Sequence, residues 1–149
     1  MAEHTPPAGR FSSGGDESFA VQVLRYLDGQ ATVQDLSELK EALATRPECR
    51  TLFVRLCRLH GELSELLAPM RAAATETAPA PARKALRECV EKLSPYARQL
   101  IRMRYVDDLS AQDVAERLNR SPNTIYVALS RTYRHLADCV ERRLAREGA

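Results

Sequence analysis

The sequence lacks the features on which most enzyme and membrane assignments rest. It contains no tryptophan, and aromatic residues make up only 5% of its 149 residues. It has no phosphate-cradling glycine motif and no HExxH motif, and its three histidines have no obvious carboxylate partners. No stretch approaches the ~20 apolar residues that a membrane-spanning helix needs. We therefore expect a protein that is not an enzyme, that has no catalytic residues or cofactor, and that has no membrane partner.

Cysteine is also scarce. The four cysteines are scattered and form no CxxC pair, which does not fit a disulfide scaffold. Cys49, Cys57 and His60 are the only candidates for a metal site. Along one helix the two cysteines would lie ~12 Å apart, too far to share an ion, so we expect no metal site. The N-terminus has no apolar run of the kind found in signal peptides, and we expect the chain in the cytoplasm.

Charge is distributed unevenly along the chain. Residues 82–149 carry 14 Lys and Arg against 9 Asp and Glu, a net charge of +5. Residues 1–81 carry 8 against 11, a net charge of −3. A basic C-terminal half behind an acidic N-terminal half favours an anionic partner for the C-terminal half alone.

The N-terminal half predicts three helices and no strand. Residues 1–15 are rich in Pro, Gly and Ser and are expected to be disordered. Apolar residues then recur at helical spacing as far as Gly29, the expected C-cap. Thr32 and Asp35 form a capping-box pattern that opens a second helix, and Pro47 takes the usual first-turn position of a third. The apolar faces of the second and third helices consist of Leu36, Leu39, Leu43, Leu52, Phe53, Leu56, Leu59, Leu63, Leu66 and Leu67.

A segment rich in proline and alanine, residues 68–82, is the clearest boundary in the sequence and predicts a semi-stiff linker. Four helices are expected beyond it. Apolar spacing indicates the first, and the others begin at Ser-Pro pairs at 94–95 and 121–122 and at a capping box on Ser110. The predicted fold is all-α, with a three-helix N-terminal segment (16–67), the linker (68–82) and a four-helix helix-turn-helix domain (83–146).

The last predicted helix has two distinct faces. On a helical wheel Ile125, Leu129, Thr132, Leu136 and Val140 share one narrow arc and predict a buried face. The opposite face is expected to point to solvent and to suit a DNA groove, and the free amides at the start of the helix can receive a phosphate. This second face consists of Asn123, Val127, Ser130 and Arg134, with Arg131 beside them.

The turn before this helix carries a further signal. Ala115, Asn119 and Ile125 have the spacing of a helix-turn-helix, in which a small residue lets the two helices cross closely. Glycine is more usual in the turn. Asparagine also tolerates the left-handed backbone conformation, so Asn119 fits the same place.

A family resemblance rests on these residues. The stretches LSPYARQLIRMRYVDDLS and DVAERLNRSPNTIYVALSR, within residues 85–144, resemble region 4 of sigma-70 family RNA polymerase sigma factors of the extracytoplasmic-function type. The resemblance implies that the last helix lies in the major groove of double-stranded promoter DNA and that the domain contacts RNA polymerase core. Carried over by position, the DNA-binding residues are Arg120, Ser121, Asn123, Thr124, Tyr126, Val127, Ser130, Arg131 and Arg134.

The implied contacts divide into two groups. Base edges would be read from Asn123, Tyr126, Val127, Ser130 and Arg131, and phosphates would be held by Arg120, Ser121 and Arg134. Tyr126 and Val127 depart from the family, which often has a lysine and another polar or basic residue there. The departure implies a weaker affinity for DNA or a different base preference. LuxR-type regulators share the helix layout and are the alternative family.

The N-terminal half does not resemble region 2, the sigma-factor domain that melts promoter DNA, because residues 16–67 lack its aromatic cluster. Instead RYLDGQATVQDLSELKEALATRPECRTLFVRLCRLHGELSELLA resembles the cytosolic segment of FecR-like anti-sigma regulators. This resemblance implies a further partner, which is either a sigma factor or a second copy of the chain bound through the N-terminal helices. Both halves together predict a DNA-binding transcription regulator. The alternative is a protein-interaction module that binds sigma factor or polymerase without reading DNA.

The tether between the halves leads to one more expectation. A linker of about fifteen residues spans roughly 20 Å or more and raises the effective concentration of the two halves to the millimolar range. We therefore expect the leucine-rich helix after Pro47 to fold back on the C-terminal half and restrain it. Dimerisation through the same apolar stripe is the alternative.

Overall fold

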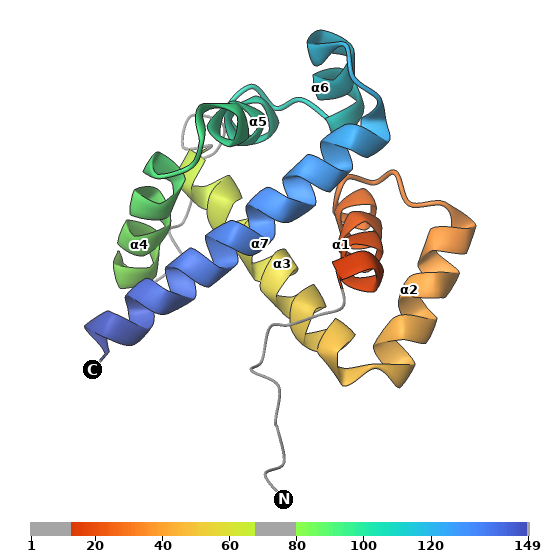
Figure 1. The fold of residues 1–149 in the computed structure, drawn as a ribbon, viewed down its shortest axis with the longest axis horizontal. Coiled ribbons are helices and arrows are strands. Elements are labelled where there is room, and N and C mark those ends of the chain that lie inside the picture. Colours follow the sequence, from red (N-terminus) through yellow and green to blue (C-terminus); the bar gives the residue numbers. More distant parts are fainter. Residues whose placement is uncertain (1–12, 68–79, 149) are drawn as a thin grey trace, which may run out of the picture.

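A computed structural model describes residues 13–67 and 80–148, which form seven α-helices and, within those ranges, no strand. The predicted all-α fold is therefore confirmed. Within the same ranges no helix is long and apolar enough to cross a membrane. The helices are α1 (Ser13–Leu27), α2 (Val33–Thr45), α3 (Pro47–Leu67), α4 (Ala80–Glu91), α5 (Pro95–Tyr105), α6 (Ala111–Leu118) and α7 (Pro122–Glu147) (Figure 1).

Two predicted segments lie largely outside the described residues. Residues 1–12 of the predicted disordered stretch and residues 68–79 of the predicted linker fall there. The remaining parts are helical: residues 13–15 belong to α1 and residues 80–82 to α4, so both segments were predicted about three residues too long.

Local sequence signals set the starts of the helices as predicted. Thr32 accepts a hydrogen bond from the amide of Asp35 at 3.0 Å, and the Asp35 carboxylate accepts one from the amide of Thr32 at 2.9 Å. This capping box satisfies two donors that a helix start would leave unpaired. Ser110 and Asp113 form the same reciprocal pair before α6. The two Ser-Pro starts are formed before α5 and α7.

Helix α7 runs through the middle of the molecule and has helices of both halves on its sides (Figure 1). α4, α5 and α6 pack along it from the C-terminal half, and α1 and α3 pack on it from the N-terminal half. The predicted inner arc from Ile125 to Val140 is buried. Because a second set of helices covers α7, four residues outside that arc are buried as well: Tyr126, Ser130, Tyr133 and Ala137.

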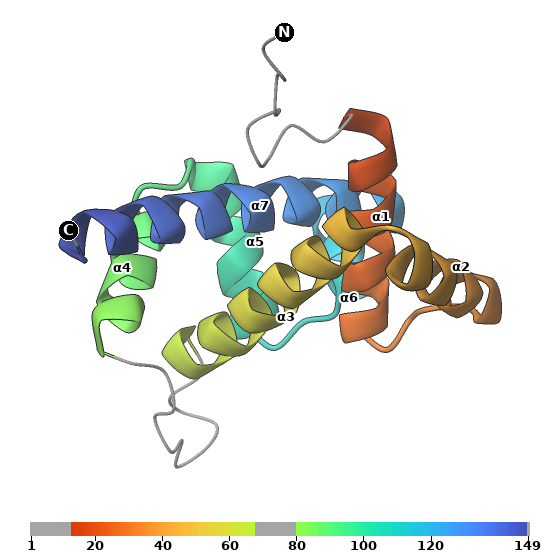
Figure 2. The ribbon, with the colours of Figure 1, turned by 90° about the horizontal axis from the view of Figure 1, so that it is seen from below.

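The two halves share one hydrophobic core. Leu56 of α3 and Leu86 of α4 are fully buried in the same cluster of side chains. At the rim of this contact Arg55 of α3 pairs with Asp138 at 2.7 Å and Glu141 at 2.8 Å, both on α7. The apolar stripe of α3 thus packs on α4, α5 and α7 of its own chain (Figure 2). The division into two segments stays a prediction, but the segments do not lie apart.

Helix α2 packs mainly on α1 and α3, and its buried residues are few. Leu39 and Ala42 are buried and Leu43 is half-buried. Leu36 is 40% exposed, so its predicted place in the apolar face was wrong. Asp35 is turned inward instead, where its carboxylate closes the capping box.

One expectation drawn from the cysteine pattern, the lack of disulfides, was wrong. Cys89 of α4 and Cys139 of α7 form a disulfide with their Cα atoms 6.1 Å apart, although the scattered cysteines predicted none. The pairing arises because α4 packs lengthwise on α7, which brings together residues 50 apart in the sequence. Glu88 and Arg143 form an ion pair between the same two helices. Cys57 is a free thiol.

Candidate nucleic-acid interface

The turn between α6 and α7 joins the two helices of the predicted helix-turn-helix. Asn119 has a φ of 54° and a ψ of 48°, the left-handed conformation that its place in the turn predicted. The amide of Arg120 donates to the Ala115 carbonyl at 2.8 Å and closes the turn. Ala115 is 1% exposed, so its methyl group lies where α6 and α7 approach each other closely.

The start of α7 is exposed and polar. Ser121 caps the helix by accepting a hydrogen bond from the amide of Thr124 at 3.2 Å, and its hydroxyl lies 2.7 Å from the Thr124 hydroxyl. The partial positive charge of a helix start and its unpaired amides favour an anion. Arg120 directly precedes this start and is exposed. The predicted phosphate contacts of Arg120 and Ser121 stay a prediction, and both residues are exposed.

The nine predicted DNA-binding residues differ in exposure. Val127 and Arg134 are half-buried. Tyr126 is 5% exposed and Ser130 is fully buried, which contradicts the expectation that this side of the helix points to solvent. Tyr126 lies under Arg25 of α1 and bonds Asp28, the residue after α1, because α1 packs on α7. The remaining five are exposed: Arg120, Ser121, Asn123, Thr124 and Arg131.

Side chains of α1 contact the residues that were predicted to read bases. Arg25 donates to the side-chain oxygen of Asn123 at 3.2 Å, and its guanidinium lies 5.5 Å from the centre of the Tyr126 ring. Glu17 accepts a hydrogen bond from Arg131 at 3.2 Å. Beside these contacts an open cleft of about 630 Å³ lies between α1, α2 and the start of α7. Helix α1 therefore covers the predicted reading side of α7.

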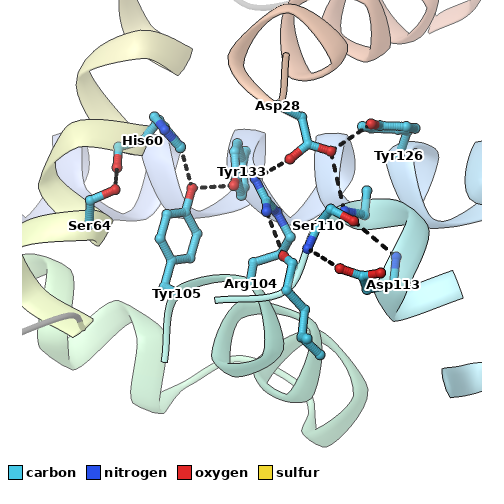
Figure 3. Close-up of polar contacts among 11 residues, drawn as sticks. Asp28, His60, Ser64, Arg104, Tyr105, Ser110, Asp113, Tyr126 and Tyr133 are labelled. Carbon is cyan, nitrogen blue, oxygen red and sulfur yellow. Dashed lines mark hydrogen bonds and ion pairs between the residues drawn. The ribbon is translucent and has the colours of Figure 1, made fainter. Parts of the chain in front are cut away.

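Asp28, the residue after α1, joins the two halves through a buried cluster (Figure 3). Its carboxylate pairs with Arg104 of α5 at 3.0 Å and accepts hydrogen bonds from the Tyr126 hydroxyl at 2.7 Å and the Ala111 amide at 3.2 Å. The Asp28 and Arg104 side chains are 7% and 13% exposed. We call Asp28, Arg104, Tyr126 and the Ala111 amide the Asp28 cluster. It ties the end of α1 to α5, α6 and α7 at once.

A second polar chain runs beside the Asp28 cluster (Figure 3). His60 of α3 lies with its Nδ1 atom 2.7 Å from the Tyr105 hydroxyl, which in turn bonds the Tyr133 hydroxyl of α7. Burial, and then the nearby Arg104 guanidinium, lower the pKa of His60. Burial raises the pKa of Tyr105. These groups are therefore held neutral, and their hydrogen bonds join α3, α5 and α7 without a charge.

The sequence contained no signal for the Asp28 cluster. Asp28 stands before Gly29, whose φ of 72° turns the chain after α1, so a turn role explained it sufficiently. Its partners lie in another half of the chain, and spacing along the sequence reports only local neighbours. Tyr126, which was predicted to read bases, instead bonds Asp28 inside the fold.

Comparisons with known proteins bear on the C-terminal half. Residues 83–136 match the family model of Sigma-70, region 4, which covers about a third of the chain. The match supports the resemblance stated for the C-terminal half. It does not extend to residues 16–67, and the resemblance of those residues to FecR-like regulators is not supported. No curated protein and no solved structure matches the chain. The segment from α4 to the middle of α7 is thus similar to a sigma region 4.

Proposed function

We propose that this chain is a transcription regulator that binds double-stranded promoter DNA and RNA polymerase core through its region-4-like segment, without a region 2. The observation that carries the proposal is the helix-turn-helix of α6 and α7 inside the region-4 match. Its turn is closed by Asn119, and α7 begins beside an exposed arginine. A helix start with free amides next to a cation suits a phosphate group.

The charge of the chain supports the same proposal. The acidic residues are concentrated in the N-terminal half, so the net positive charge belongs to the half that carries the helix-turn-helix. Arg120 lies just before the start of α7 and Arg134 lies further along the same helix, and neither forms an ion pair with a carboxylate of the described residues. Both guanidinium groups are thus placed to displace counterions from a DNA backbone.

Phosphate binding predicts a steep dependence of affinity on salt. We expect the full chain to bind a 30-base-pair duplex at 50 mM salt and to lose most of this affinity at 200 mM, because each arginine releases a counterion. Arg120→Ala and Arg134→Ala should each weaken binding to every sequence and lower the slope of log K against log salt by about 1. Fluorescence anisotropy of labelled duplexes measures both quantities.

Arg58→Ala is the matched control for the two arginine variants. Arg58 is exposed on α3, in the half that the region-4 match does not reach, and its loss removes the same charge. We expect the salt slope of this variant to equal that of the wild-type chain. No binding of duplex at 50 mM salt by the folded wild-type chain would contradict the proposed function.

A second candidate function follows from the contacts of α1. Because side chains of α1 contact Asn123, Tyr126 and Arg131, the predicted reading side of α7 is occupied inside the molecule. A module that binds sigma factor or polymerase without reading DNA needs no access to that side. Capture of purified core polymerase by the tagged chain, with and without duplex, separates the two functions. Equal capture in both, together with no duplex binding, favours the second candidate.

A further inference from the structure

The contacts of α1 divide the predicted DNA-binding residues in two. We call the five residues predicted to read bases the base-reading face: Asn123, Tyr126, Val127, Ser130 and Arg131. Three of them contact side chains of α1, namely Asn123, Tyr126 and Arg131. Val127 lines the cleft between α1 and α7, and Ser130 is buried. Two of the three residues predicted to hold phosphates, Arg120 and Ser121, are exposed, and within the described residues their side chains form no hydrogen bond or ion pair with α1. The molecule therefore leaves two phosphate-binding groups without an α1 partner, while its base-reading groups are buried or engaged near α1.

The contacts on the base-reading face resemble those that DNA would make. The side-chain oxygen of Asn123 accepts a hydrogen bond from the Arg25 guanidinium. An asparagine that reads a base accepts a hydrogen bond from the base edge with the same oxygen. Arg131 pairs with the Glu17 carboxylate, which is an anion like the phosphate groups of DNA. Helix α1 thus supplies hydrogen-bond partners to Asn123 and Arg131 within the molecule. The same atoms cannot bond α1 and a duplex at the same time.

Ser130 is a buried polar residue of the base-reading face. Its hydroxyl is fully buried and, alone among the buried side-chain polar atoms of the described residues, has no hydrogen-bond partner. A buried hydroxyl without a partner destabilises the state that buries it.

The Asp28 cluster holds α1 in place over this face. Asp28 is the first residue after α1 and makes charge-assisted contacts with three helices of the C-terminal half. Tyr126 belongs to both the cluster and the base-reading face, so its hydroxyl cannot leave Asp28 without loosening α1. The exposed ion pair between Glu17 and Arg131 adds a second contact at the other end of α1.

From these observations, and resting on the proposed DNA binding, we propose that α1 is an autoinhibitory element that blocks base reading but not phosphate binding. In the closed form the chain binds duplex DNA with little regard to sequence. When α1 leaves α7, the base-reading face is free and the chain selects particular sequences. The apparent affinity for a selected sequence is reduced by the small fraction of molecules that are open. The affinity for other sequences, which rests on phosphate contacts, changes little.

Selection from a random duplex library tests this division. Full-length wild-type chain and Asp28→Asn are each incubated with 30-base-pair duplexes of random sequence at 50 mM salt, and the bound pools are sequenced. We expect the wild-type pool to stay close to random and the Asp28→Asn pool to be enriched in one sequence pattern. For that pattern the dissociation constant of Asp28→Asn should be at least about tenfold lower than that of the wild-type chain, because the open fraction rises.

Two further variants keep the result interpretable. Glu48→Gln removes one negative charge at the start of α3, where the residue is exposed, and should leave the pool close to random. It controls for a general rise in DNA affinity caused by lost negative charge. Glu17→Gln breaks the exposed ion pair with Arg131 at little risk to folding and should give the same pattern with weaker enrichment. Circular dichroism verifies that each variant is folded.

The outcomes separate this inference from the proposed function. A wild-type pool as enriched as that of Asp28→Asn would show that α1 does not block base reading. Folded Asp28→Asn and Glu17→Gln that bind duplex without enrichment would overturn the inference and leave DNA binding intact. If no folded variant binds duplex at 50 mM salt, the proposed function is wrong and the inference falls with it.

Discussion

Replacing Leu56 by alanine is expected to lower the free energy of unfolding by about 2–5 kcal/mol, because truncation of a fully buried leucine leaves a cavity. Leu56 lies on α3 with none of its surface exposed, in the core cluster that also contains Leu86 and Tyr133. If the halves unfold as one unit, the loss appears in a single transition that includes α7. Urea unfolding followed by far-UV circular dichroism, with amide exchange of α7 as a second probe, measures it.

Val54→Ala is the control for this prediction. Val54 lies on the same helix but is 52% exposed, so the change should stay within about 0.5 kcal/mol. Two separate transitions, with α7 unfolding at the wild-type urea concentration in Leu56→Ala, would contradict a shared core. That result would mean that α3 rests on the C-terminal half without contributing to its stability.

The second large effect concerns the disulfide between Cys89 and Cys139. Its two cysteines lie 50 residues apart, and a cross-link that closes a loop of this length is expected to stabilise the folded chain by about 2–4 kcal/mol. Reduction, or the double variant Cys89→Ala with Cys139→Ala, should lower the urea midpoint accordingly. The loss arises because the unfolded chain regains the freedom that the cross-link removes.

Cys57→Ser is the control for the disulfide. Cys57 is a free, half-buried thiol, and its replacement removes a sulfur without touching the cross-link. Reducing agent should lower the midpoint of Cys57→Ser as much as that of the wild-type chain and leave the double variant unchanged. Equal midpoints for oxidised and reduced wild-type chain would mean that the cross-link adds no stability.

The sequence predicted the features that depend on a few neighbouring residues. The capping boxes at Thr32 and Ser110 and the Ser-Pro starts of α5 and α7 each satisfy free amides within one helical turn, so their residues stand close together in the sequence. The left-handed Asn119 is likewise a property of one turn. Periodicity also placed Ile125 and its arc on the buried side of α7.

The sequence misled where contacts come from distant residues. A helical wheel gives the most apolar side of α7 but not how many sides are covered, so Ser130 was expected in solvent. Tyr126 was expected to read bases because of the family resemblance, and it is buried as well. Tyr126 has a large apolar ring and one hydroxyl, which fits a buried site when the hydroxyl finds a partner. That partner, Asp28, lies 98 residues away. The same limit applies to the Cys89–Cys139 pair.

The placement of α1 changes how the proposed function is to be tested. An assay on the full chain with an arbitrary duplex reports only the exposed phosphate-binding groups, among them Arg120 and Ser121. Such an assay would give binding without specificity even if α7 reads DNA when α1 is displaced. Measurements of sequence preference and of the position of α1 are therefore needed together.

Amide hydrogen exchange of the full wild-type chain, free and bound to the duplex selected by Asp28→Asn, tests whether α1 and DNA compete for the base-reading face of α7. Exchange in α1, at residues 19–27, should then become faster when the duplex binds, while exchange in the first half of α7 becomes slower. Unchanged or slower exchange in α1, with the duplex bound at α7, would contradict the account.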